Sequence, residues 1–520
     1  MNLELDSKGK IISPVPDWAR FLIVAFLLAL PIALWVAWQF VNLTIILGVA
    51  FLLFVALIGF ISFKTALSLL VVFLPLEPLV VKFIPADFAL YFRLVPEVII
   101  LSLFIVGFTK FLRNKNLPRV NNPIVLPLFI FAGICVLSIL VNRVDPLIAG
   151  VGLRQLFRFF ALSLAVYFYG FTRKDILKLV TLVAVIAFFE SALGLVQAVL
   201  GAQIDALLQT GKDLYIGRFQ VAREFFQNRS PGERVFATMG RYDQLGTFLS
   251  LVAAVSLGFI YEAKEKVKKY SLLLLIVILP TLLLTYSRAS WFGFILGLIL
   301  VAIFIKKDKK VLAILLILIT AVVSYVGIRE IEVRKLTDEA EVSPINRLLE
   351  AFSAKRLRGE YTAKGRLYFL IETPPAILQD SPVLGVGPGQ FGGGATTLTH
   401  NTEAYDKLNL PFGVYGVEGT IDNNWMSIFA ETGILGLLAY IFIFVAVLRF
   451  ARKAYRDPDS DWLARSFSLG LMAATMGFIL QGFLGTYFEV RTLAPYYWLT
   501  FALAVLSYSQ AKYKNENTSS

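Results

Sequence analysis

Apolar runs of roughly 20 residues recur from one end of this sequence to the other, separated by shorter polar or basic segments. A run of this length, folded as a helix, crosses the roughly 30 Å hydrocarbon core of a bilayer. The chain has 520 residues, and 58% of them are hydrophobic, which is more than a soluble globular domain requires. In lipid, each backbone group must be paired internally, and continuous apolar runs lack the alternation of a membrane barrel. The sequence therefore predicts an all-α polytopic membrane protein.

We expect about fourteen transmembrane helices. The segment before the first of them is largely polar and has no cleavable signal pattern, so we expect the first span to be retained. The predicted spans lie near residues 20–38, 43–62, 65–84, 95–112, 124–141, 154–171, 177–200, 243–262, 271–286, 290–305, 311–328, 424–449, 463–485 and 493–510.

Clusters of lysine and arginine between these spans predict the orientation. With the spans as given, every cluster falls on one side, which the positive-inside rule identifies as the cytoplasm. Both termini are then cytoplasmic. The clusters are Lys110, Arg113, Lys115 and Arg119; Arg173, Lys174 and Lys178; Lys264, Lys266, Lys268 and Lys269; Lys306, Lys307, Lys309 and Lys310; and Arg449, Arg452, Lys453 and Arg456.

This topology divides the chain into helical regions and two outer loops. The large loop precedes the twelfth span, and no internal repeat is evident. The predicted regions are N-terminal helices (1–200), a first extracytoplasmic loop (201–242), further helices (243–328), a large extracytoplasmic loop (329–423), C-terminal helices (424–510) and a cytoplasmic tail (511–520).

Charge and rare residues exclude several kinds of site. Much of the net charge of +13 lies in short loops that set topology, so it does not indicate a nucleic-acid partner. The one cysteine, Cys135, lies within an apolar run and can form no internal disulfide. The one histidine, His400, leaves no zinc-binding spacing and is expected at the surface of a loop. We expect neither a metal nor a cofactor.

Arginine is frequent in both predicted outer loops. Guanidinium groups bind phosphate oxygens through paired donors and stay charged when partly buried, so a diphosphate site at the membrane surface would use them. The alternative is a set of solvated charges that pair with acidic neighbours such as Glu360. The arginines are Arg218, Arg223, Arg229, Arg234 and Arg241 in the first loop, and Arg334, Arg347, Arg356, Arg358 and Arg366 in the second.

Three more arginines lie at or near predicted span ends. Arg288 separates two apolar runs on the outer side, where it either lines a site or extends to the interface. Arg154 and Arg158 are four residues apart and share one helix face. They either line the same cavity or cap a helix at the interface.

The segment from Gly365 to Gly436 has the densest set of polar residues. Its glycine-rich stretch lacks the lysine and the flanking strand of a Walker motif. The glycines, Gly385, Gly387 and Gly389, either let backbone N–H groups approach a ligand or form a tight turn over the helices.

Polar residues also surround the start of the predicted span 424–449. Asp422, Asn423 and Asn424 are all good N-cap residues, but a helix start also offers N–H groups to an anion. Glu431 would lie about two turns inside the span, where a carboxylate needs a buried partner, and we expect an arginine. Glu489 and Arg491 are candidates for the same cluster.

Three sequence blocks occur on the predicted outer side. They are Thr285-Tyr286-Ser287-Arg288-Ala289-Ser290-Trp291; Gly365-Arg366 followed by Ser381-Pro382-Val383-Leu384-Gly385-Val386-Gly387-Pro388-Gly389-Gln390-Phe391; and Asp422-Asn423-Asn424-Trp425 with Glu431-Thr432-Gly433-Ile434-Leu435-Gly436-Leu437. In order, spacing and membrane side, they resemble motifs of the O-antigen ligase and polymerase superfamily of bacterial envelope glycan enzymes. Arg234-Val235-Phe236-Ala237-Thr238-Met239 is a weaker match, and recognisable motifs cover about residues 230–450.

The resemblance implies a GT-C-like, metal-independent glycosyltransferase of the bacterial inner (plasma) membrane. Its donor would be a polyprenyl-diphosphate-linked oligosaccharide, its acceptor a glycan or lipid, and other polysaccharide-assembly proteins are possible partners. Arg288 and Arg366 would bind the diphosphate, and Asp422 would orient or deprotonate the acceptor hydroxyl. The implied substrate-binding residues are Arg234, Arg241, Gly385, Gly387, Gly389, Asn423, Glu431 and Arg491.

One position departs from the family pattern. Ligases of the family carry a histidine where this chain has Asp422, and His400 does not replace it. The polymerase branch tolerates an Asp-Asn version, so the departure favours polymerisation of repeat units over ligation to a lipid or protein acceptor.

Two other classes of protein compete with a glycosyltransferase. A solute (inorganic carbon-like) transporter is disfavoured by the absence of repeats. A non-enzymatic scaffold is disfavoured by the cost of Arg288 and Glu431 near the membrane, unless they form a structural pair.

Overall fold

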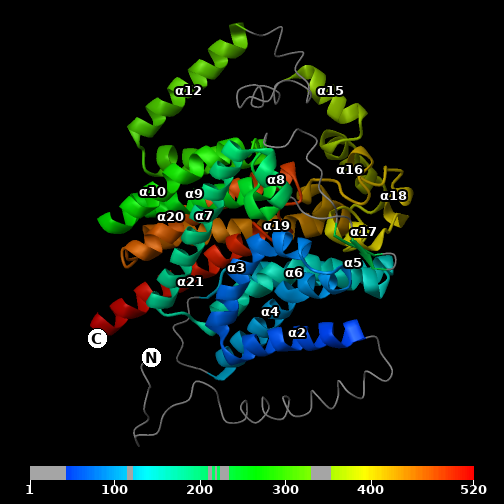
Figure 1. The fold of residues 1–520 in the computed structure, drawn as a ribbon, viewed down its shortest axis with the longest axis horizontal. Coiled ribbons are helices and arrows are strands. Elements are labelled where there is room, and N and C mark those ends of the chain that lie inside the picture. The colour runs from blue at the N-terminus through cyan, green and yellow to red at the C-terminus, as the bar shows by residue number, and fades with distance from the viewer. Residues whose placement is uncertain are drawn as a thin grey trace, which may run out of the picture.

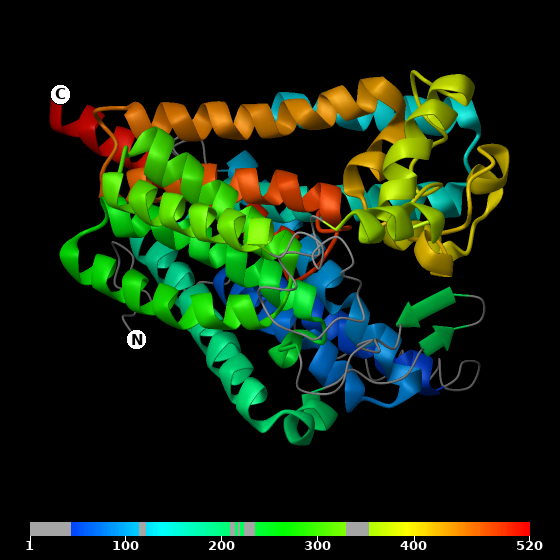
Figure 2. The same cartoon turned by 90° about the horizontal axis from the view of Figure 1, so that it is seen from above.

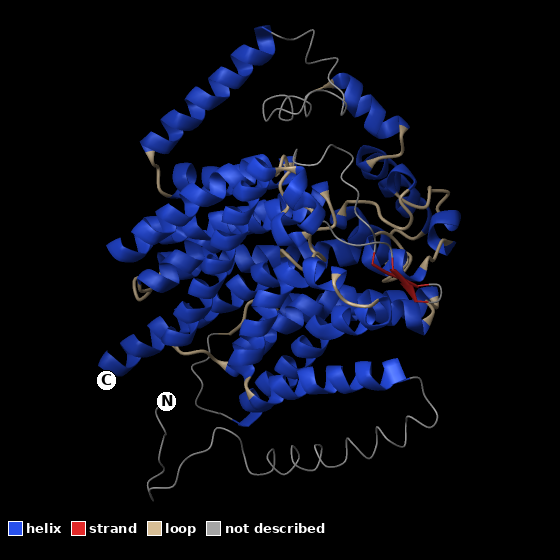
Figure 3. Ribbon diagram, in the orientation of Figure 1, coloured by secondary structure: helices blue, strands red, loops and turns tan. Residues whose placement is uncertain are grey.

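The chain folds into a bundle of long helices (Figure 1, Figure 3). The structure is a computed structural model that describes residues 43–113, 121–208, 214–216, 219–222, 234–328 and 353–519. Eleven helices in these ranges are long and apolar enough to cross a membrane. The chain is therefore an all-α polytopic membrane protein, as the apolar runs predict. A short antiparallel hairpin, β1 (Leu214–Ile216) and β2 (Phe219–Ala222), is its one sheet within the described ranges.

Most predicted spans correspond to one helix each. The candidate spans are α2 (Leu43–Ile61), α3 (Phe63–Lys82), α4 (Ala86–Arg113), α5 (Val125–Asn142), α6 (Pro146–Tyr169), α7 (Arg173–Leu200), α9 (Tyr242–Glu262), α10 (Glu265–Leu284), α11 (Arg288–Leu298) with the π-helical η2 (Ile299–Ile305), α19 (Asn424–Arg456) and α20 (Trp462–Leu484). Two further long helices, α12 (Lys309–Ile328) and α21 (Ala494–Ser519), overlap the predicted spans 311–328 and 493–510. The predicted span 20–38 lies outside the described residues.

Two helices begin earlier than predicted. α4 starts at Ala86 rather than near residue 95, and α6 starts at Pro146 rather than near residue 154. In both cases charged residues near the predicted start lie inside the helix instead. Arg154 is therefore within α6 and not at its end, so its interpretation as a helix cap is wrong.

Local sequence explains several helix starts. At α7, Thr172 accepts a hydrogen bond from Asp175 N, and the Asp175 carboxylate accepts one from Thr172 N, which forms a capping box. At α6, Asp145 accepts from Leu147 N, and Pro146 occupies the first helical position, where its missing N–H is not needed.

The centre of the bundle is formed by α9, α20 and α21, which are buried along most of their length. Aromatic rings fill much of the space between them. Phe259 of α9 and Phe467 of α20 meet edge to face at 5.3 Å, and Phe478 of α20 stacks on Tyr497 of α21 at 4.2 Å. In contrast, α10 exposes many apolar side chains, as a lipid-facing helix should, and α12 extends away from the bundle (Figure 1).

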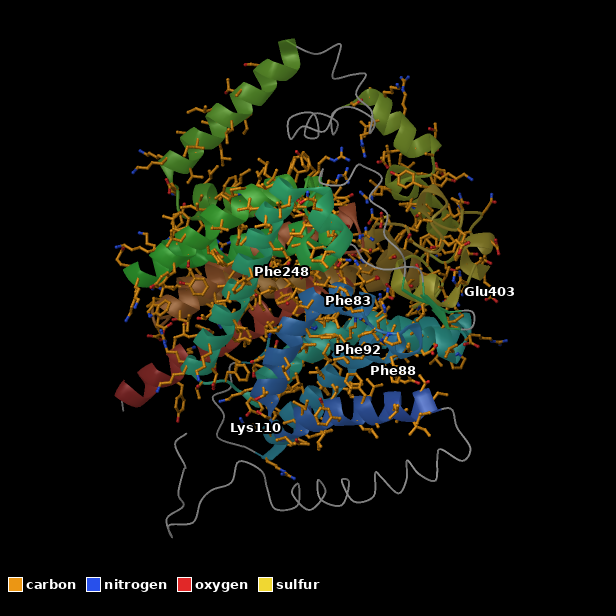
Figure 4. All side chains as sticks on the ribbon, in the orientation of Figure 1. Phe83, Phe88, Phe92, Lys110, Phe248 and Glu403 are labelled. Carbon is orange, nitrogen blue, oxygen red and sulfur yellow. The ribbon has the colours of Figure 1, made fainter. Side chains whose placement is uncertain are left out.

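The large loop folds into short helices at one end of the bundle, which we call the loop end (Figure 2). Lys110 of α4 lies far from this end, whereas Glu403 of α18 lies at its edge (Figure 4). The elements of the loop are α15 (Ala354–Thr362), α16 (Arg366–Asp380), α17 (Gly393–Thr399), α18 (Glu403–Lys407) and the 3-10 turn η4 (Val414–Gly416). Before α9 come α8 (Ala202–Leu208) and the turn η1 (Ala237–Met239).

Ion pairs join the helix ends that carry basic clusters. Arg173 at the start of α7 pairs with Asp461 before α20. Lys306 after η2 pairs with Glu262 at the end of α9, and Tyr455 of α19 donates to the same carboxylate at 3.1 Å. These clusters therefore share the end opposite the loop end. Its assignment to the cytoplasm stays a prediction.

Candidate functional site

Two motif residues form an ion pair at the loop end. Arg366 is the first residue of α16, and its Nε and Nη2 lie 3.2 and 2.9 Å from Oδ2 of Asp422. The two side chains are 39% and 24% exposed, so the pair remains reachable from solvent. Asp422 has a φ of 50°, in the left-handed region that Asp and Asn tolerate best after glycine. The second and third sequence blocks thus meet in one partly exposed site.

A second guanidinium group faces this pair. Arg241 directly precedes α9, and its Nε and Nη2 each lie 3.0 Å from a carboxylate oxygen of Asp243. Burial alone would raise the pKa of Asp422, but the positive charges of Arg366 and Arg241 outweigh it and hold that pKa below its ordinary value. Burial would lower the pKa of Arg366, yet Asp422 raises it well above the ordinary value. Both partners are therefore held charged.

Two tyrosines surround these charges. The Tyr487 hydroxyl, in the segment between α20 and α21, lies 3.5 Å from Asp243 Oδ2. Burial and the charge of Asp243 hold the pKa of Tyr487 well above its ordinary value, so it stays a neutral hydrogen-bond donor. The guanidinium carbon of Arg234 lies 4.2 Å from the centre of the Tyr242 ring, in a cation–π contact. The sequence analysis missed Asp243, Tyr242 and Tyr487, although Asp243 lies only two residues from a predicted site arginine.

The segment that carries Arg234 and Arg241 is fixed by two polar residues of α7. Glu190 accepts from Thr238 Oγ1 at 2.5 Å and from Thr238 N at 3.2 Å. Gln197 Oε1 accepts from Phe236 N and Ala237 N, both at 2.9 Å. These buried contacts hold the turn η1 against the bundle. Arg234 and Arg241, which lie on either side of this turn, therefore extend from a fixed backbone.

Arg288 lies next to the same segment. It is the half-buried first residue of α11, directly after the turn that follows α10. Val235 N donates to Leu284 O at 3.3 Å, which places the Arg234 segment against that turn. Trp291 Nε1 donates to Leu282 O at 2.8 Å and fixes the start of α11. The structure thus brings Arg234, Arg241 and the start of α11 to neighbouring positions at the loop end.

Glu431 holds the glycine-rich stretch. Its Oε1 accepts from Gly389 N at 2.8 Å and Phe391 N at 3.3 Å, and its backbone carbonyl accepts from Gly387 N at 2.9 Å. The expected arginine partner is wrong, because among the described residues no arginine lies within ion-pair distance of Glu431. The glycine N–H groups bind this buried carboxylate and leave the loop packed on α19.

The glycine-rich stretch inserts where α19 is interrupted. Gly433 has a φ of 65°, which breaks the helix, and Ile434 N then donates to Pro382 O at 2.9 Å. A Cβ atom on Gly385 would lie 2.3 Å from Ala430 O, so any side chain there would separate the two segments. The glycines of the second and third blocks therefore allow the two backbone segments to pass close to each other at this point.

The start of α19 is capped by Asn423 and not by Asp422. Asn423 is buried, and its Oδ1 accepts from Met426 N at 3.1 Å. Asn424 accepts from Phe488 N at 2.8 Å and donates to Glu489 Oε1 at 3.2 Å. The alternative that Asp422 is only an N-cap is wrong, since its side chain binds Arg366. Asn423 is therefore a buried cap and does not face solvent.

Arg491 belongs to a different group of charges. Its Nη2 lies 2.8 Å from Glu97 Oε1, and its Nη1 pairs with Glu77. Arg154 and Arg158 bind the same Glu97 oxygen at 2.7 and 2.9 Å. The sequence analysis missed both glutamates, although an acidic residue inside an apolar run is itself a signal.

The remaining predicted residues have varied places. His400 lies 3.2 Å from Glu418 in the loop. Arg356 pairs with Glu360 at 3.2 Å, and both of these side chains are mostly buried, so this pair is not a solvated one. Within the described ranges, no group of three or more His, Cys, Asp or Glu could hold a metal ion. Five predicted arginines lie outside the described residues: Arg218, Arg223, Arg229, Arg334 and Arg347.

Comparison with known proteins agrees with the three blocks. Residues 270–441 match the model of the O-antigen ligase family. No curated protein matches the chain. The matched segment contains Arg288, the Arg366–Asp422 pair, the glycine-rich stretch and Glu431. Over residues 270–441 this chain is therefore similar to the O-antigen ligase family, in agreement with the resemblance that its motifs predicted.

Proposed function

We propose that this protein is a metal-independent glycosyltransferase that polymerises oligosaccharide repeat units carried on polyprenyl diphosphate. It would work at the outer leaflet of the bacterial inner (plasma) membrane, with both termini in the cytoplasm, as an O-antigen or exopolysaccharide polymerase. The observation that carries the proposal is the partly exposed Arg366–Asp422 pair, with Arg241 beside it, inside the segment that matches the O-antigen ligase family.

The arginines would act on the donor. Arg366 uses Nε and Nη2 for Asp422, which leaves Nη1 for a phosphate oxygen. In the reaction, the bond from the anomeric carbon to the phosphate oxygen breaks, and its electron pair stays on the diphosphate. Arg366, Arg288 and Arg241 would neutralise that growing charge, which is greatest in the transition state. The lipid tail of the carrier stays in the bilayer beside the helices.

Asp422 would act on the acceptor. Its carboxylate is held ionised by Arg366 and Arg241, so it can accept a hydrogen bond from the attacking sugar hydroxyl. The same arginines make it a weak base. Asp422 therefore takes the proton only as the hydroxyl oxygen bonds to the anomeric carbon and the proton becomes acidic. The products are the extended glycan and the free polyprenyl diphosphate.

A ligase is the second candidate, because the matching family is described as O-antigen ligase. It would use the same donor and transfer the glycan once, to a lipid or protein acceptor. The carboxylate of Asp422 in place of the ligase histidine favours the polymerase. Other polysaccharide-assembly proteins are expected partners in either case.

The decisive experiment supplies the purified protein in lipid with a polyprenyl-diphosphate-linked oligosaccharide and sizes the products on a gel. A polymerase makes a ladder of repeating units, and Arg366→Lys should make most of that ladder disappear. A single product that appears only with a lipid or protein acceptor would identify a ligase. Binding of the glycan without any product would argue against both enzymes.

A further inference from the structure

Six charged side chains meet inside the bundle, below the loop end. We call them the arginine cluster: Arg93, Arg154, Arg158, Arg491, Glu77 and Glu97. Glu97 Oε1 accepts from Arg154 at 2.7 Å, from Arg158 at 2.9 Å and from Arg491 at 2.8 Å. The elements that supply these residues are α3, α4, α6 and the segment between α20 and α21.

The cluster lies inside long apolar helices and not at their ends. With a rise of about 1.5 Å per residue, Arg93 and Glu97 lie roughly 10 and 16 Å from the first residue of α4. By the same measure, Arg154 and Arg158 lie roughly 12 and 18 Å from the first residue of α6. Charges within candidate membrane-spanning helices are costly and usually mark an ion or substrate site.

The charges of the cluster do not balance. Four guanidinium groups face the two carboxylates Glu77 and Glu97, which leaves an excess of two positive charges. Glu489 is a further acid beside Arg158, and counting it as ionised still leaves four positive charges against three negative ones. An excess positive charge in a low dielectric is unfavourable unless an anion joins it.

Arg93 is the clearest sign of a missing partner. Arg93 interacts electrostatically with Glu77, Glu97 and Arg491, but it makes no ion pair with any of the described residues. Its Nε is buried without a hydrogen-bond partner, as are the Nε atoms of Arg154 and Arg158. The side chain of Arg154 is 38% exposed, so the cluster is accessible from one side.

We propose that the arginine cluster is a second anion site, separate from the Arg366–Asp422 pair, and that it binds the phosphate of a lipid headgroup. The identity of that lipid as the carrier of the acceptor glycan rests on the proposed function. Transfer between two lipid-linked glycans involves two diphosphates, one that leaves and one that keeps carrying the acceptor. The cluster would hold the second, while the lipid tail stays in the bilayer.

One segment connects the two sites. The Glu489 carbonyl accepts from Arg158 Nη2 at 2.6 Å, and its carboxylate binds Asn424 at the start of α19. Two residues earlier, Tyr487 lies against Asp243 beside the Arg366–Asp422 pair. An anion in the cluster would therefore act on the segment that also lines the first site.

The test counts bound lipids by native mass spectrometry of the intact protein. Polyprenyl diphosphate and phosphatidylglycerol are supplied in separate arms. The key variant is Arg93→Gln, since Arg93 pairs with no described carboxylate and its removal should leave the fold intact. Arg173→Gln, which removes an arginine paired with Asp461 at the opposite end, is the matched control. Thermal unfolding of each variant checks the fold.

We expect the wild type to bind two polyprenyl diphosphates, with Arg93→Gln weakening one of them by about tenfold or more. Arg366→Gln should remove the other, and the double variant both. If Arg366→Gln changes nothing while Arg93→Gln still weakens binding, the proposed function fails and the cluster stands. Loss of phosphatidylglycerol binding in Arg93→Gln would assign the site to a phospholipid. Unchanged binding of both lipids in a folded Arg93→Gln protein overturns the proposal.

Discussion

Glu431 and Gly389 are joined by a hydrogen bond of 2.8 Å from the glycine N–H to the buried carboxylate, and through it the glycine-rich stretch is anchored on α19. Phe391 N binds the same oxygen, so one side-chain atom satisfies two buried donors. The carboxylate therefore determines the position of a loop that the sequence alone suggested as a ligand-binding surface.

The first prediction concerns this anchor. Glu431→Gln keeps an oxygen at the same place, so the protein should remain folded with near-normal stability. Glu431→Ala leaves two buried N–H groups without an acceptor, at a cost of about 1–3 kcal/mol each. Thermal unfolding in detergent measures the difference. An alanine variant as stable as the glutamine variant would show that the loop has another anchor.

The second prediction concerns the type of positive charge. Arg366→Lys and Arg288→Lys should both lose most activity in the gel assay, because a flexible ammonium group cannot reproduce the paired contacts of a guanidinium with phosphate. Lys364 is a charged neighbour of Arg366 and has a φ of 53°, in the left-handed region that Asn adopts more readily than most residues. Lys364→Asn is therefore a suitable control, with a mild effect expected. Near-normal activity of both arginine-to-lysine variants would mean that these side chains do not bind the diphosphate.

How much of this site the sequence could predict is clear from particular residues. The order and spacing of the motif blocks were enough to predict that Arg366 and Asp422 belong to one site, but not that they form an ion pair with each other. The partner of Glu431 could not be predicted. Every residue except proline has a backbone N–H, so residue type does not show which of these groups binds a carboxylate. The same holds for the choice of Asn423 over Asp422 as the cap.

The helix boundaries show the same limit. Apolar runs predicted nearly all the helices, but α4 and α6 extend beyond the residues expected for them. Arg93, Glu97 and Arg154 interrupt the apolar pattern, so each looks like a helix end. Their place inside the bundle depends on pairing between helices far apart in sequence, such as Arg491 with Glu97. Hydropathy along the sequence carries no information about such pairs.

The third prediction concerns pH. Asp422 has a pKa below its ordinary value of 3.8, so the stabilisation from its ion pair is present above that value and is lost as pH falls through the lower, folded-state pKa. Activity that needs the ionised carboxylate should therefore persist at pH 4. Arg241→Gln removes one of the two charges that lower this pKa, so the acid limb of its pH–rate profile should move to higher pH. An unchanged acid limb would show that another group controls it.

The fourth prediction concerns orientation. Reporter fusions at Lys268, Lys309 and Arg452 should report the cytoplasm, and fusions at Gln220 and Thr397 the outside, because the basic clusters share the end opposite the loop end. Thr397 is the critical position, since it lies in α17 beside the glycine-rich stretch. A cytoplasmic report there would place the candidate site on the wrong side for an outer-leaflet reaction.

The last prediction isolates the charge of Asp422. Asparagine has nearly the same volume, accepts a φ of 50° at least as well, and can still offer an oxygen to Arg366. The cap of α19 is unaffected, because Asn423 provides it. Asp422→Asn therefore changes little besides the negative charge, which a base needs and a structural contact does not.

If Asp422 takes the proton of the acceptor hydroxyl, Asp422→Asn should lower the rate of glycan formation by about 100-fold or more while the protein stays folded and inserted. A variant that makes full-length glycan at the normal rate would show that Asp422 only positions Arg366. If the variant is inactive, product analysis of the wild type decides between the two enzymes. A ladder of repeat units on the polyprenyl carrier identifies a polymerase. A single transfer to a lipid or protein acceptor identifies a ligase that uses a carboxylate where its relatives use a histidine.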